Sequence, residues 1–77
     1  MSTNTTRTFV GTETFRVEGM TCDHCRHAVT TEICAVPGVE SVAVDLPTGT
    51  VTVSATAPVD RSDIAAAVDE AGYTLLP

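Results

Sequence analysis

Residues 42–53 of the chain read VAVDLPTGTVTV. Apolar residues alternate with polar or small ones on both sides of a short segment, residues 47–49, that contains proline and glycine. A period of two is typical of strands with one buried face, and Pro and Gly are typical of tight turns. The stretch therefore predicts a β-hairpin. Its alternating apolar residues are Val42, Val44, Leu46, Val51 and Val53.

A strand and a helix are predicted before this hairpin. Residues 12–17 again alternate, with Phe15 and Val17 on one side. Beyond Gly19 the spacing becomes helical, and Thr21 is the first plausible helix cap. The apolar residues of this predicted helix recur at i, i+4, i+8 and i+11, as Cys25, Val29, Ile33 and Val36. The helix must end before the turn signal Pro37-Gly38.

A second helix and a last strand are predicted after the hairpin. Asp60 is a good N-cap residue, and Gly72 is a typical stop signal. Between them, Ile64, Val68 and Ala71 form an apolar stripe. Residues 73–76 are expected to form a short final strand.

The resulting order of elements is βαββαβ. Two βαβ halves joined by a hairpin predict a four-stranded antiparallel sheet with two helices on one face, the ferredoxin-like sandwich. A chain of 77 residues has room for one such domain. We expect residues 1–11, which are rich in threonine, to be a flexible lead-in or at most a frayed strand extension at Phe9-Val10, and residues 12–77 to form the domain.

Composition excludes several classes of function. Ten acidic residues against four arginines and no lysine give a net charge of −6. This balance argues against nucleic-acid binding and against an anionic membrane surface. The sequence has no apolar run of about 18 residues and no apolar leader, so we expect a cytoplasmic protein whose thiols stay reduced. Three cysteines, an odd number, fit poorly with a disulfide framework.

The residues that carry chemistry are in the stretch GMTCDHC, residues 19–25. Cys22 and Cys25 can converge on one ion if the first lies in the loop and the second in the first helical turn. Free backbone N–H groups and the helix dipole there favour the thiolate, which is the form that binds metal. Two soft thiolates suit Cu(I) best. Zn(II) usually takes four ligands, and the chain has no second CxxC.

The same residues resemble the GMxCxxC motif of the heavy-metal-associated domain family, with bacterial copper chaperones the nearest type. The resemblance extends over residues 12–76 and includes the turns at 37–39 and 45–49 and the segment 71–73. It implies that Cys22 and Cys25 bind Cu(I) in a near-linear bis-thiolate site. It also implies transfer of the ion to the metal-binding domain of a copper-transporting P-type ATPase, or to a copper-sensing regulator. Met20 corresponds to a methionine that packs beneath the metal loop, and Tyr73 to an aromatic residue near the site in bacterial members.

The remaining candidate residues have structural interpretations that the sequence favours. His24 is expected to be a solvated loop residue, with a third-ligand role across a metal-bridged dimer as the alternative; without metal we expect a monomer. His27 is expected at the surface, and Tyr73 as a packing residue rather than a ligand. Cys34 lies nine residues from Cys25, on the opposite side of a helix at about 100° per residue, and is expected to be an inert surface thiol.

The leading hypothesis is thus a metal carrier and not an enzyme, since no catalytic set of Ser, His and Asp residues, carboxylate pair or phosphate loop is present in the sequence. The alternatives are a mercury or zinc/cadmium carrier, a thiol oxidoreductase and a regulatory module of a larger ATPase. The acidic second helix also predicts a recipient with a basic surface.

Overall fold

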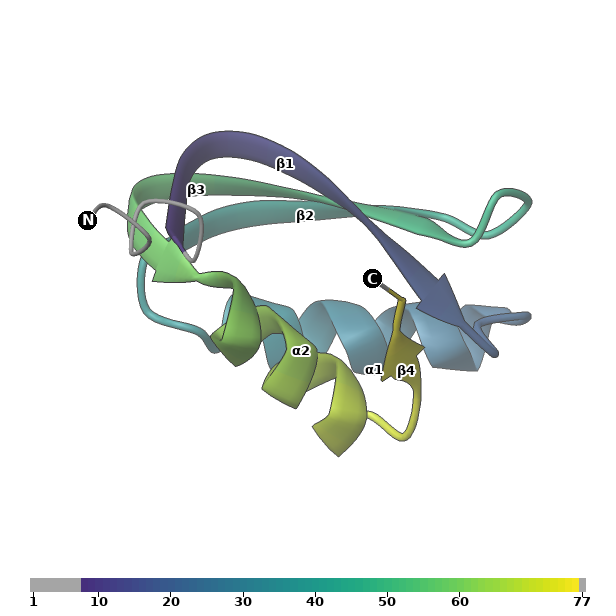
Figure 1. The fold of residues 1–77 in the computed structure, drawn as a ribbon. Coiled ribbons are helices and arrows are strands. Elements are labelled where there is room, and N and C mark those ends of the chain that lie inside the picture. Colours follow the sequence, from purple (N-terminus) through teal and green to yellow (C-terminus); the bar gives the residue numbers. More distant parts are fainter. Residues whose placement is uncertain (1–7, 77) are drawn as a thin grey trace.

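The computed structural model describes residues 8–76, whose elements follow the predicted order (Figure 1). The strands are β1 (Thr8–Glu18), β2 (Val39–Asp45), β3 (Thr50–Asp60) and β4 (Thr74–Leu75), and the helices are α1 (Asp23–Cys34) and α2 (Arg61–Glu70). In this described part of the chain the longer helix has 12 residues, and neither helix has the length or apolar character needed to cross a bilayer.

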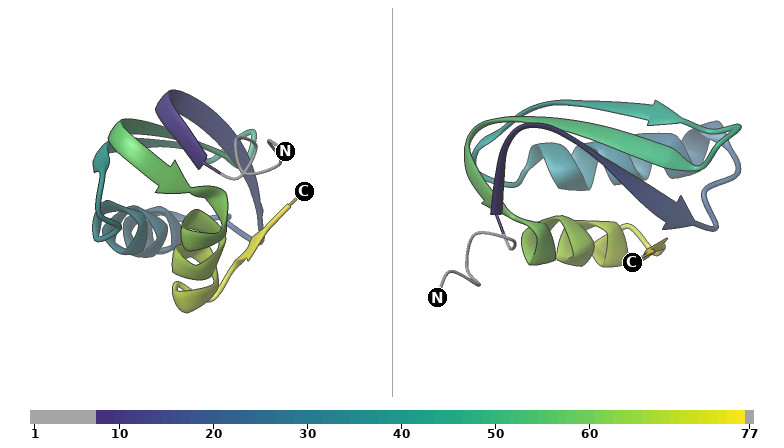
Figure 2. Two further views of the ribbon diagram at one scale, coloured as in Figure 1. Left: turned by 60° about the vertical axis from the view of Figure 1, so that its left-hand side comes forward. Right: turned by 45° about the horizontal axis from the view of Figure 1, so that its top comes forward.

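The sheet has the strand order β2-β3-β1-β4, and all neighbouring strands are antiparallel. Both helices lie side by side against one face of it (Figures 1 and 2). The predicted hairpin is present, with Val42 opposite Val53 and Val44 opposite Val51. At its turn Gly49 has φ +68°, and its N–H donates to the carbonyl of Asp45 at 2.9 Å. The ferredoxin-like prediction is therefore confirmed.

The hydrophobic core lies between the sheet and the helices. The predicted periodicities identify it correctly, because alternate strand residues and every third or fourth helix residue are buried. Its completely buried or nearly completely buried members include Val29, Ile33, Val51, Val53, Val59, Ile64 and Val68. Since the core uses small aliphatic residues, it needs close packing between layers to exclude water.

Strand β1 begins at Thr8, so residues 8–11 form a strand extension, the alternative given for Phe9-Val10, and do not form the flexible lead-in that was the first expectation. Phe9 is buried and opposes Val59 at the far end of β3. Its ring lies 5.5 Å from that of Phe15, and the guanidinium of Arg61 lies 5.7 Å from its centre on the outer side. A register shift between Phe9 and Gly11 interrupts the ladder, which is why the alternation is hard to follow in the sequence. Residues 1–7 and Pro77 are outside the described residues.

The N-cap of helix α1 lies one residue later than predicted. Cys22, not Thr21, is the N-cap residue, with extended backbone angles and no capping hydrogen bond from its side chain. The thiol of Cys22 therefore occupies the position that Ser, Thr, Asp or Asn usually take. This leaves the N-terminal N–H groups of α1 without a partner from that cap.

Helix α2 begins and ends as predicted. The carboxylate of Asp60 accepts from the backbone N–H and the hydroxyl of Ser62, at 2.9 and 2.7 Å. At the other end Gly72 has φ +95°, its N–H donates to Asp69, and the N–H of Tyr73 donates to Val68. These two bonds are those of a Schellman motif, which reverses the chain and directs it toward β1.

Candidate metal centre

The stretch GMTCDHC spans the loop between β1 and α1, residues 19–22, and the first turn of α1. We call residues 19–22 the metal loop, after the role predicted for them. Gly19 starts the loop with φ +90°, a conformation that favours glycine. A Cβ at this position would lie 3.5 Å from the ring of Tyr73, so the loop and the segment after α2 pack closely. Met20 is 3% exposed and belongs to the core, so its thioether anchors the loop from below and is not presented to solvent.

The two motif thiols lie next to each other but differ in exposure. The Sγ atoms of Cys22 and Cys25 are 3.2 Å apart, and both cysteines are free. Cys25 is 7% exposed and belongs to the apolar stripe of α1, whereas Cys22 is exposed. An ion held by this pair would therefore have one buried sulfur ligand, from Cys25, and one exposed sulfur ligand, from Cys22, that an incoming partner could reach.

Cys25 is an unusually acidic thiol. The pKa of Cys25 is lowered from 9.0 to about 6. The largest cause is a hydrogen bond from the hydroxyl of Tyr73, followed by hydrogen bonds from the backbone of Thr21 and the thiol of Cys22. Burial of the thiol acts in the opposite direction. The same contact raises the pKa of Tyr73, because its proton is shared with a sulfur anion. At neutral pH Cys25 is therefore mainly a thiolate and ready to bind metal.

Tyr73 has a larger role than its predicted one. The sequence suggested a packing residue near the site, and the ring does pack over Gly19. Its hydroxyl also stabilises the Cys25 thiolate, which sequence reasoning missed. The family resemblance placed an aromatic residue near the site, but neither this resemblance nor the position of Tyr73 directly after Gly72 indicated that its hydroxyl would stabilise the thiolate.

The other candidate residues do not join the thiol pair. His24 is exposed, and no group of three or more His, Cys, Asp or Glu side chains within residues 8–76 is placed to hold one ion. His27 is exposed, as predicted. Cys34 is also exposed, at the end of α1, about 14 Å along the helix axis from Cys25. The structure thus brings together only Cys22 and Cys25, with Tyr73 beside them.

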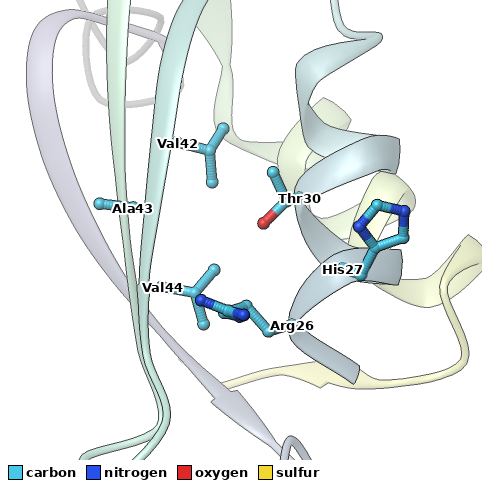
Figure 3. Close-up of a pocket in the computed structure, with 6 residues that line it drawn as sticks. All are labelled: Arg26, His27, Thr30, Val42, Ala43 and Val44. Carbon is cyan, nitrogen blue, oxygen red and sulfur yellow. The ribbon is translucent and has the colours of Figure 1, made fainter. Parts of the chain in front are cut away.

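A hollow of about 430 Å³ lies between α1 and β2, and it contains no sulfur atom. Figure 3 shows Arg26 beside Val44, while the ring of His27 is turned away from β2. Arg26 also pairs with Asp23 at 3.3 Å. The hollow is thus a neighbour of the metal loop and not part of the thiol site.

Comparison with known proteins identifies the family of this domain. Residues 14–74 match the heavy-metal-associated domain. The chain belongs to this family. Among heavy-metal-associated proteins, the copper chaperone CopZ of Bacillus subtilis is 45% identical over 62 residues, which cover 79% of this chain and 90% of the relative. Copper-transporting ATPase 2 of Rhizobium meliloti is 45% identical over 67 residues, which cover 86% of this chain and 8% of the ATPase.

A solved structure of a similar protein has the same fold. The structure of a CopZ metallochaperone has a TM-score of 0.80 at 35% identity and covers 84% of this chain and 98% of its own. Membership of the heavy-metal-associated domain family therefore accounts for the fold.

Proposed function

We propose that this protein is a copper chaperone that binds one Cu(I) ion through Cys22 and Cys25. The observation that carries the proposal is the adjacent thiol pair, 3.2 Å apart, in which one sulfur is acidic and buried and the other exposed. Similarity to proteins named as copper chaperones supports the choice of metal. Their names describe carriers, which supports a role other than catalysis for this chain.

The donor set favours Cu(I) over Zn(II). Soft thiolates and a low coordination number suit Cu(I), while Zn(II) usually requires four ligands. Within residues 8–76 the two thiols have no third His, Cys, Asp or Glu ligand gathered around them. Zn(II) bound here would need ligands from water or another molecule.

Transfer is proposed to proceed by thiolate exchange without redox change. A thiolate of the recipient binds the ion, and the bond to exposed Cys22 breaks; a second recipient thiolate then displaces Cys25. The copper stays Cu(I), and the released thiolates take up protons according to their pKa values. We propose the metal-binding domain of a copper-transporting P-type ATPase as recipient, because part of such an ATPase is similar to this chain. A copper-responsive regulator remains a second recipient to test.

The proposal includes a cytoplasmic location and a copper-free monomer. Reduced thiols are required for the site, and they persist in a reducing compartment. A metal-bridged dimer would require a ligand from a second molecule, for which His24 is the exposed candidate.

Native mass spectrometry of the reduced protein, offered Cu(I) and Zn(II) in competition, tests this function. We expect one copper ion per monomer, loss of tight binding in Cys22→Ser and Cys25→Ser, and unchanged binding in Cys34→Ser. Preferential retention of zinc, or tight copper binding by the Cys22→Ser/Cys25→Ser double variant, would contradict the proposal.

A further inference from the structure

A second surface of the molecule has the character of a docking groove. It lies between α1 and α2 and has a volume of about 350 Å³. Its floor is apolar, and Val36, Pro37 and Ala66 contribute to it. Glu32 is the residue of this groove that lies nearest to Cys25 along α1. It is seven residues beyond Cys25, or about 10 Å along the helix axis. The α1 side of the groove is therefore separate from the metal loop, and on the α2 side Glu70, the groove residue nearest in sequence to Tyr73, lies three residues before it.

Three carboxylates surround this apolar floor, from Glu32 on α1 and from Asp63 and Glu70 on α2. No cationic side chain from residues 8–76 lines the groove. The ion pairs in that part of the chain join Arg26 to Asp23 and Arg61 to Glu13, so the three rim carboxylates have no cationic partner there.

The helix dipole adds to the negative potential of the groove. The last turn of α1, which carries the partial negative charge of the dipole, lies at the groove and has no basic residue. The chain as a whole carries −6. A second copy of the chain would thus bring acidic groups against acidic groups, which disfavours self-association through this face.

We propose that this groove binds a basic amphipathic segment of a partner protein, with an apolar side chain on the floor and Lys or Arg residues against the rim. Apolar contact at the centre and charged contact at the edge are typical of peptide grooves that accept amphipathic helices. The inference goes beyond copper transfer and does not depend on it, because none of its residues belongs to the metal loop. It would let a partner hold the chaperone while Cys22 remains open.

A binding measurement on the full-length, reduced, copper-free chain tests the groove. The probe is a fluorescein-labelled 15-residue amidated peptide with leucines at helical spacing along one side and lysines beside them, and its affinity is measured by fluorescence anisotropy. We expect the variant Glu32→Gln/Asp63→Asn/Glu70→Gln to bind at least about tenfold more weakly, since several exposed charge contacts are lost together.

The matched control is Glu18→Gln/Glu40→Gln/Asp45→Asn, which removes the same three charges from the sheet. We expect it to weaken binding less than threefold. Equal weakening in both triple variants would mean that only the general negative field attracts the peptide, and this would overturn the proposal.

A second variant tests the floor, since a field effect alone would not depend on it. Ala66→Arg places a cation in the groove and keeps a good helix-forming residue, so the fold should persist. Ala43→Arg adds the same charge on β2, away from the groove. We expect a loss of affinity at least fivefold greater for Ala66→Arg than for Ala43→Arg.

Amide NMR of the complex with the peptide shows directly where on the protein the peptide binds. Peptide-induced shifts should be concentrated in residues 32–37 and 63–70, with residues 20–25 little changed. Shifts centred on the metal loop, or equal losses of affinity in the two arginine variants, would refute a separate groove.

Discussion

Replacement of Tyr73 by phenylalanine would test the origin of the acidity of Cys25. The change removes one hydroxyl and keeps the ring that packs over Gly19. At pH 7 a thiol with a pKa of about 6 is about ten parts thiolate to one part thiol, while at the ordinary value of 9.0 only about one part in a hundred is thiolate. Because the Tyr73 hydroxyl is the largest cause of the shift, its loss should lower the thiolate-to-thiol ratio by roughly tenfold.

The assay is the rate of alkylation by iodoacetamide against pH, on a background of Cys22→Ser and Cys34→Ser so that Cys25 alone reacts. The serine at position 22 keeps a hydroxyl donor beside the sulfur. We expect the rate profile of Tyr73→Phe to move to higher pH, with the largest difference from Tyr73 between pH 6 and 7. At high pH both thiols are ionised, and the rates should agree within about threefold, because a less acidic thiolate is also more nucleophilic.

Thr74→Val is the matched control, since it removes an exposed hydroxyl one residue from Tyr73. Its profile should coincide with that of the parent. Superimposable profiles for Tyr73→Phe and its parent, with both folded by circular dichroism, would refute the assignment of the Tyr73 hydroxyl as the main stabiliser of the thiolate.

Four further predictions concern copper affinity, stability and transfer. Cys34→Ser should change copper affinity less than threefold in a competition titration, because the thiol lies about 14 Å along α1 from Cys25; a large loss would mean that this thiol takes part in binding. Phe9→Ala should lower the free energy of unfolding by about 3 kcal/mol in urea, and exposed Val10→Ala by less than about 0.5 kcal/mol, and equal effects would contradict the burial of Phe9. The depressed pKa of Cys25 should make the reduced protein more stable as pH rises from about 6 to 9, where the unfolded thiol is protonated and the folded one is not, and this gain should be absent in Cys25→Ala. Copper transfer to a recipient domain should slow as salt is raised, since the net charge is −6, and a rate independent of ionic strength would exclude electrostatic steering.

The sequence was sufficient for the order of elements because its patterns are local. The alternation around residues 47–49, the cap at Asp60 and the stop at Gly72 each depend on neighbours in the chain, and all three are confirmed. The strand predicted from alternation began at residue 12, whereas β1 begins at Thr8, because Phe9 pairs with Val59, fifty residues away, across a shift in register. No periodicity within residues 8–11 carries that information.

The candidate site also has features that the sequence predicted and features that it did not. Spacing identified Cys22 and Cys25 as a pair, and the structure places their sulfurs in contact. The burial of Cys25 follows from its place on the apolar stripe of α1, which the spacing of the sequence predicted. The role of the Tyr73 hydroxyl is not encoded in the motif, because it depends on how α2 ends and on how the chain returns to β1.

The Schellman turn after α2 has a consequence for when the chain can acquire metal. Gly72 directs the last residues back so that β4 pairs with Val17 and Glu18, and the N–H of Leu76 donates to Arg16 at 2.8 Å. Only then does Tyr73 reach Cys25. A nascent or proteolytically clipped chain that lacks these last residues contains both cysteines but lacks the largest cause of the low pKa of Cys25, so at neutral pH we expect protons to compete with copper more strongly. If the thiol pair binds copper as proposed, completion of the fold at the C-terminal end should therefore strengthen binding, and truncated chains should yield copper to intact ones.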